Sequence, residues 1–193
     1  TMLGRTLVRQ TRFDEAVVYL QRAVAVQEGV YGPVHPAVAS AVNELGSVAL
    51  QRNRLDEADA AFSRMAEIYR KVFPSKHFLI GIAVSNLGSV YTARADHARA
   101  EGLYREAIAL FSETQSPTHV NVGIARLKLG RALLRQGRHG AAEAELLAGL
   151  DIMTKQTSPS VAWVKNGRED LVALYDATAQ PDKAAPYRVA LAK

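Results

Sequence analysis

The chain has 193 residues, no cysteine, 48% apolar residues and a formal net charge of +5. The lack of cysteine excludes disulfide bonds, thiolate catalysis and cysteine-ligated metals, and no apolar stretch approaches the roughly 20 residues of a membrane-spanning helix. No signal-peptide pattern opens the sequence, so we expect a soluble, cytoplasmic protein. The basic residues are spread over the whole chain, with arginine in excess of lysine. This bias favours bidentate recognition of carboxylates or phosphates, although the base composition of a genome produces the same bias.

A leucine–glycine pair recurs along the chain at a constant step of 42 residues. The pair occupies positions 3–4, 45–46, 87–88 and 129–130, and Leu171 follows one step later. An alanine column keeps the same step at positions 16, 58, 100, 142 and 184. Self-similarity at a fixed period is the signature of a repeat architecture, so the sequence predicts an array of five structural units.

Each unit predicts two helices. In the first, Val42, Leu45 and Ala49 show helical spacing, and this helix begins about nine residues before the leucine in the later units. A short breaker-like stretch follows, as at 51–54, 94–96 and 136–138. Connections this short force the two helices to be antiparallel. The second helix carries the alanine and, four residues later, a bulky residue such as Phe62, Tyr104 or Leu146. Proline-containing segments separate the units, and Ser75, which replaces one proline, is a good N-cap type.

The small residues of both columns predict the places where the two helices approach closely. These are Gly46, Gly88 and Gly130 on the first helix and Ala58, Ala100 and Ala142 on the second. A larger side chain at these positions is expected to overpack the contact.

This pattern resembles the tetratricopeptide repeat (TPR), in the 42-residue form of kinesin light chain. The resemblance covers essentially the whole chain and implies an all-α, right-handed superhelical solenoid of antiparallel helix pairs, with a bacterial source. We expect one array over 1–193, with repeats at about 1–34, 35–76, 77–118, 119–160 and 161–193. The first repeat is truncated at its N-terminus, and the last forms a short C-terminal cap. This closing pair resembles the end of TPR regions attached to bacterial serine/threonine kinases.

The five histidines fall into two repeat columns, which argues against a metal or catalytic site. His35, His77 and His119 precede first helices, and His97 and His139 stand where second helices begin. Equivalent residues of adjacent repeats are about 10 Å apart, whereas zinc ligands lie about 2 Å from one ion. No nucleophile elbow, phosphate loop or zinc-protease motif is present. We therefore expect no metal, no cofactor and no enzymatic activity.

The resemblance implies that the first helices line a concave groove, and the residues at the groove positions are polar with basic ends. They are Arg5, Arg9, Asn43, Ser47, Gln51, Ser85, Asn86, Ser89, Lys128, Arg131 and Arg135. Because residues at i and i+4 share a helix face, Arg5 with Arg9 and Arg131 with Arg135 are candidate forks for a carboxylate. The alternative is that these positions are simply solvated.

An apolar run, 78–82, opens the third of the first helices, and Ile124 lies one period after Ile82. A helical period cannot bury the whole run, so Ile82 and Ile124 are expected to form an apolar floor for a peptide with hydrophobic anchors flanked by acids. Tighter packing between repeats is the alternative interpretation.

The sequence therefore predicts a non-catalytic scaffold that binds an acidic or mixed peptide, or a partner protein, in the concave groove. The alternative is a C-terminal regulatory region of a larger multidomain signalling enzyme such as a bacterial serine/threonine kinase. Self-association through the open N-terminal face is a further possibility. Nucleic-acid binding is disfavoured because aromatic residues make up 7% of the chain and no dense basic block exists. No membrane interaction is expected.

Overall fold

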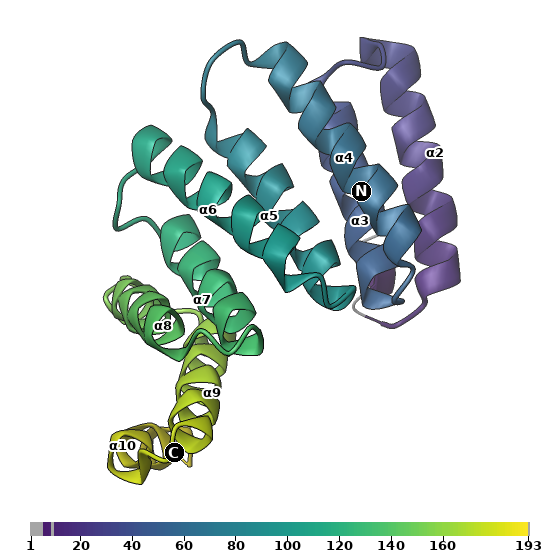
Figure 1. The fold of residues 1–193 in the computed structure, drawn as a ribbon. Helices are drawn as coiled ribbons and strands as arrows, with labels where there is room; N and C mark the ends of the chain where they lie inside the picture. Colours follow the sequence, from purple (N-terminus) through teal and green to yellow (C-terminus); the bar gives the residue numbers. More distant parts are fainter. Residues whose placement is uncertain (1–5, 9, 193) are drawn as a thin grey trace. The chain divides into compact units, whose positions relative to one another are not determined.

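The computed structural model describes residues 6–8 and 10–192, and the helices α2 to α10 within this part of the chain are shown in Figure 1. The chain divides into two compact units, Thr1–Arg94 and Ala95–Lys193. The first leucine–glycine pair lies outside the described residues.

The first unit contains α2 (Phe13–Tyr31), α3 (Pro36–Gln51), α4 (Leu55–Val72) and α5 (Phe78–Ala93). Helix α2 packs against α3, α3 against α4, and α4 against α5 (Figure 1). Residues 6–8 are also helical, and Leu7 is buried.

The second unit contains α6 (His97–Thr114), α7 (Val120–Arg135), α8 (His139–Thr154), α9 (Val161–Ala177) and α10 (Pro181–Leu191). Successive helices again pack against each other, and α7 also contacts α9. In both units the first helices of the repeats, α3, α5 and α7, begin nine residues before their leucine. The prediction of an all-α fold made of antiparallel helix pairs is therefore confirmed.

Histidine caps the first helix of three repeats. The imidazole Nδ1 atoms of His35, His77 and His119 accept hydrogen bonds from the backbone N–H two residues further on, at 3.1, 3.2 and 3.1 Å. These bonds satisfy one of the N–H groups that the first turn of a helix leaves without a partner. The expectation that Ser75 serves as a cap is wrong, because α5 begins two residues later, after His77. His77 is also held by the ring of Phe73, which stacks on it at 3.7 Å between ring centroids.

The turn from the first to the second helix of each repeat has a fixed conformation. One residue per turn is in the left-handed region, with φ between 55° and 71°: Thr11, Asn53, Ala95, Gly137 and Ala179. These residues are also spaced at 42 positions. Ala95 and Ala179 carry a Cβ atom but no polar group that could hydrogen-bond locally, and left-handed backbone costs such residues about 1 kcal/mol. The repeat therefore imposes this turn even where the local sequence disfavours it.

The predicted close contacts within helix pairs are confirmed at Gly46 and Gly130. A Cβ atom on Gly46 would lie 2.7 Å from the ring of Phe62, and one on Gly130 would lie 2.6 Å from Cγ of Leu146. Both bulky partners are at most 1% exposed, and the alanines of the second helices are fully buried.

Within the part of the chain that the structure describes, no helix combines the length and apolar character needed to cross a membrane.

Candidate partner-binding surface

In the first unit, the predicted groove residues are largely engaged with one another. The side-chain amide of Asn86 on α5 donates a hydrogen bond of 2.8 Å to Oδ1 of Asn43 on α3. This bond joins equivalent faces of two neighbouring first helices. Because the two amide side chains pair with each other, fewer of their hydrogen-bonding groups are available to a ligand on this surface.

The serines of this face also bond within their own helices. The hydroxyl of Ser47 donates to the carbonyl of Asn43 at 2.9 Å, and that of Ser89 donates to the carbonyl of Ser85 at 3.2 Å. Ser85 itself is buried, with 5% of its surface exposed, because its side chain lies on the packed side of α5. Gln51 is exposed and Ile82 is half-buried. Ser85 thus contributes to packing, and among the described residues of this unit Gln51 is the most accessible of the predicted polar ones.

In the second unit, the predicted carboxylate fork already holds a carboxylate. The Nε atom of Arg131 on α7 lies 3.0 Å from both carboxylate oxygens of Asp170 on α9, and Nη2 lies 2.9 Å from Oδ2. The Asp170 side chain is 14% exposed and that of Arg131 is 36% exposed. Asp170 is not among the residues predicted from the sequence, although it stands one period after Lys128 and extending that column into the fifth repeat would identify it.

The charge balance at Asp170 is set by two opposing effects. Burial raises the pKa of the Asp170 carboxyl group above its ordinary value, whereas the hydrogen bond and charge of Arg131 and the charge of Arg135 lower it. Arg135 is exposed at the end of α7. Its guanidinium is therefore close enough to act on Asp170 and is also accessible to solvent.

Lys128 lies between two aromatic rings. Its Nζ atom is 5.8 Å from the ring centroid of Tyr104 on α6 and 5.8 Å from that of Trp163 on α9. A cation at this distance is attracted by the negative face of each ring. Burial, with a smaller contribution from the charge of Arg131, lowers the pKa of Lys128 to about 8. Sequence reasoning missed Trp163, the single tryptophan of the chain, because tryptophan is not part of the pattern at that position.

Lys128 is expected to titrate near pH 8, and its charge is expected to oppose folding. Its pKa is about 8 in the folded chain against an ordinary value of 10.5, so the unfolded chain binds more protons between these values. Stability should therefore rise with pH across this window, and Lys128→Met should remove that rise. The ¹³Cε shift of Lys128 measured against pH gives the pKa, and urea unfolding of both proteins gives the slope. A lysine titrating above pH 10 would contradict the prediction.

The remaining predicted residues lie apart or outside the described part. Ile124 on α7 is half-buried. Arg5 and Arg9, the other predicted fork, lie outside the described residues. A hollow of about 240 Å³ opens between the C-terminal halves of α7 and α9, beside Arg131 and Arg135. Asp170 and the small residues Ala173 and Ala177 form its α9 side. The structure thus brings Arg131, Arg135 and Asp170 together on one face.

Among the described residues, no group of three or more histidine or acidic side chains is arranged to hold a metal ion. The histidines instead occupy the two scaffold positions that their columns predict, as helix caps and as the first residues of α6 and α8.

The helix pairs, their histidine caps and the 42-residue period define a protein of the helical-repeat class. The sequence model of the tetratricopeptide repeat family matches residues 1–71 and 79–155, and the chain therefore belongs to this family. Tetratricopeptide repeat proteins are typically non-catalytic scaffolds for protein–protein interaction. A comparison with curated proteins found no match.

Several solved structures share the fold. Two crystal structures of a candidate kinesin light chain of Podosopora anserina, with nearly identical TPR-like repeats, have TM-scores of 0.79 and 0.77. Both are 21% identical to this chain, with 98% of this chain and 90% of the other covered. BtubC (BKLC) from P. vanneervenii has a TM-score of 0.83 at 18% identity, covering 96% of this chain and 74% of its own. The apo form of RapI has a TM-score of 0.81 at 12% identity, and the match covers 96% of this chain and 65% of RapI. These similarities establish the kinesin light chain-like repeat fold.

Proposed function

We propose that the chain is a scaffold whose α7–α9 face binds a carboxylate-bearing segment of a partner protein. The observation that carries this proposal is the bidentate contact between Arg131 and Asp170. This contact supports the proposal because the guanidinium of Arg131 is oriented toward a carboxylate, and such two-point contacts are the strongest form of arginine–carboxylate recognition.

Arg135 supplies the second charge of the proposed site. It lies one helical turn after Arg131, so both side chains project from the same face of α7. Arg135 is exposed, and it lines the hollow between α7 and α9 together with Arg131 and Asp170. A partner carboxylate in this hollow would pair with Arg135 while Asp170 retains Arg131. Lys128 and Trp163 extend the face toward the N-terminal half of α7 with a cationic and an aromatic group.

The proposal is tested by reversing the charge of Arg135. We expect Arg135→Glu to weaken binding of a fluorescein-labelled peptide of alternating leucine and glutamate about tenfold, which corresponds to about 1.4 kcal/mol. Fluorescence anisotropy measures the dissociation constant. Arg99→Glu on α6 is the charge-matched control, because Arg99 is exposed and lies on a second helix of its repeat. Binding that is unchanged by Arg135→Glu, or weakened equally by both substitutions, would contradict the proposal.

Self-association is a second candidate function, and the observation that favours it is the exposed apolar surface of α2. Val18, Val26, Val30 and Tyr31 are 55% to 66% exposed, and large exposed apolar groups are typical of interaction surfaces. A second copy of the chain is the proposed occupant. A solution mass that stays monomeric at all concentrations would exclude it. A regulatory role within a larger signalling enzyme stays a hypothesis, which the full-length coding sequence decides.

A further inference from the structure

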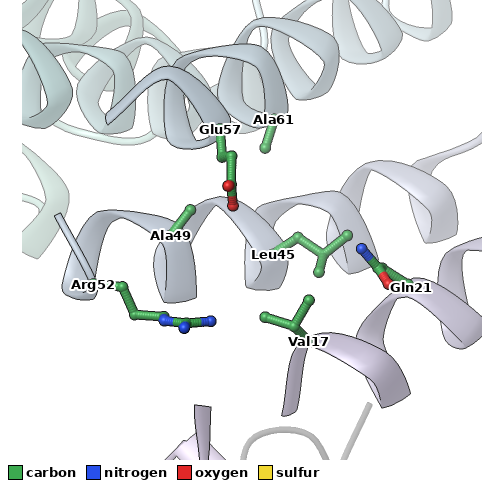
Figure 2. A pocket seen from close by; sticks show the side chains of 7 residues that line it. All are labelled: Val17, Gln21, Leu45, Ala49, Arg52, Glu57 and Ala61. Atoms are coloured by element: carbon green, nitrogen blue, oxygen red, sulfur yellow. The ribbon is translucent and has the colours of Figure 1, made fainter. Parts of the chain in front are cut away.

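A second pocket lies on the opposite side of α3 from the predicted groove residues. Figure 2 shows its lining, and its volume is about 290 Å³. The residues that line it are Val17 and Gln21 from α2, Leu45, Ala49 and Arg52 from α3 and its C-cap, and Glu57 and Ala61 from α4. Leu45 and Ala49 are each two residues from Ser47, and two residues turn a helix by about 200°. This pocket is therefore separate from the face that carries Asn43 and Ser47.

The repeat register shows what fills the corresponding position elsewhere in the same chain. Three repeats later, Ala49 corresponds to Tyr175 on α9 and Ala61 corresponds to Tyr187 on α10. The two tyrosine rings stack on each other with centroids 6.1 Å apart. Tyr175 is 3% exposed, so its ring fills the space between α8, α9 and α10.

The groups around Tyr175 show how this position holds an aromatic ring. The hydroxyl of Tyr175 donates a hydrogen bond of 2.9 Å to Glu143 on α8. The ammonium of Lys183 on α10 lies 5.4 Å from the centre of the ring. An aromatic ring at this position of the repeat thus receives a cation, a carboxylate and a second ring.

In the first unit, both rings are missing and the charges around the position differ, because Val17 stands at the position of Glu143 and Glu57 at that of Lys183. Leu45 is the register equivalent of Leu171 and forms the apolar floor. Arg52 supplies a cation at the rim, where its guanidinium also pairs with Asp14 at 2.7 Å. Glu57 supplies a carboxylate on the α4 side. Because alanine occupies both tyrosine positions, the volume stays open, and Figure 2 shows the short side chains of Ala49 and Ala61.

We propose that this pocket binds an aromatic side chain, of the tyrosine type, that a partner protein inserts between α2 and α4. The ring would lie on Leu45 and Val17, where burial of apolar surface stabilises it, with Arg52 at its face or edge. Val18 continues the apolar surface beyond the pocket, since it is 63% exposed and lies three residues from Gln21 on α2. This site is distinct from the carboxylate-binding face and does not depend on it.

The probe for this proposal is 4-methylphenol, the side chain of tyrosine in isolation. In the wild-type chain, we expect it to shift the methyl NMR signals of Val17, Leu45, Ala49 and Ala61, saturating with a dissociation constant on the order of 1–10 mM, as befits so small a ligand. In Ala49→Tyr, the chain supplies its own ring. We expect the dissociation constant of 4-methylphenol, measured from the methyl signals of Val17, Leu45 and Ala61, to rise at least about tenfold. Ala93→Tyr, at an exposed position of α5, adds the same side chain outside the pocket and should leave the shifts unchanged.

A second filling variant guards against misfolding of the first. Ala61→Leu fills the pocket from α4, with the residue that Leu103 supplies one repeat later, and we expect it to abolish binding as well. Arg135→Glu should bind 4-methylphenol like the wild type, so failure of the carboxylate-binding proposal would not affect this one. Absence of shifts in the wild type at about 20 mM probe, a concentration at which the expected constant gives at least about two-thirds occupancy, would overturn the proposal. Shifts that persist in both filled variants would do so equally.

Discussion

Gly130→Ala is expected to lower the free energy of unfolding by about 1–2 kcal/mol, because the new methyl group has no space in the α7–α8 contact. The Cβ atom would lie 2.6 Å from Cγ, 2.8 Å from Cδ2 and 3.1 Å from the backbone nitrogen of Leu146. Leu146 is fully buried, so a rotamer change cannot remove the overlap and α8 has to shift. The expected loss of about 1–2 kcal/mol is a net value, because alanine has a helix propensity about 1 kcal/mol better than that of glycine and this gain offsets part of the steric cost.

Gly102→Ala is the matched control, with an effect of opposite sign. Gly102 lies in the interior of α6, it is exposed, and a Cβ atom there would meet no other group within 4 Å. Only the propensity gain remains, so we expect this variant to be about 0.5–1 kcal/mol more stable. Urea unfolding followed by circular dichroism measures both variants. Two equal stabilisations would refute the steric origin of the glycine column.

The fold could be predicted from the sequence because its main determinants recur at one fixed step. Spacing alone predicts close approach of the two helices at Gly46 and Gly130, and the structure adds that Phe62 and Leu146 are the residues they contact. The same step assigns the five histidines to scaffold positions from the sequence alone. The position of the cap in the third repeat was wrong, because serine is the better cap in isolation whereas His77 gains support from stacking on Phe73. The stacking is a contact between side chains, and the preference of a residue type for the cap position does not include it.

The site was predicted less completely, because side chains on neighbouring helices determine which groups are available. The pairing of Asn43 with Asn86 joins residues 43 positions apart, and that of Arg131 with Asp170 joins residues 39 apart. Neither follows from residue type. The tyrosine-sized pocket was missed for another reason. Ala49 and Ala61 look like ordinary helix residues until the register sets them beside Tyr175 and Tyr187.

Arg131→Ala is expected to destabilise the second unit by about 2 kcal/mol at neutral pH, because Asp170 would keep a largely buried charge without its main partner. Breaking a fully buried ion pair costs about 3–5 kcal/mol, and the exposure of Arg131, 36%, reduces this value through solvent screening. The double variant Arg131→Ala with Asp170→Ala removes both charges and is expected to recover most of the lost stability. Urea unfolding of the single variants and the double variant gives the coupling energy.

The pH dependence gives an independent check on this explanation. In the folded wild type the pKa of Asp170 is already raised by burial, so its ionisation opposes folding, and this effect disappears as pH falls below the folded pKa. Removing Arg131 takes away the main group that lowers this pKa, so the pKa should rise further. The deficit of Arg131→Ala should therefore shrink from neutral pH toward about pH 4, as the carboxyl group is protonated. A deficit that is constant with pH, or a double variant as unstable as Arg131→Ala, would mean that Arg131 stabilises the chain by packing. In that case the ion pair of Arg131 with Asp170 would not be what stabilises the second unit, and it would no longer support the proposed carboxylate-binding site.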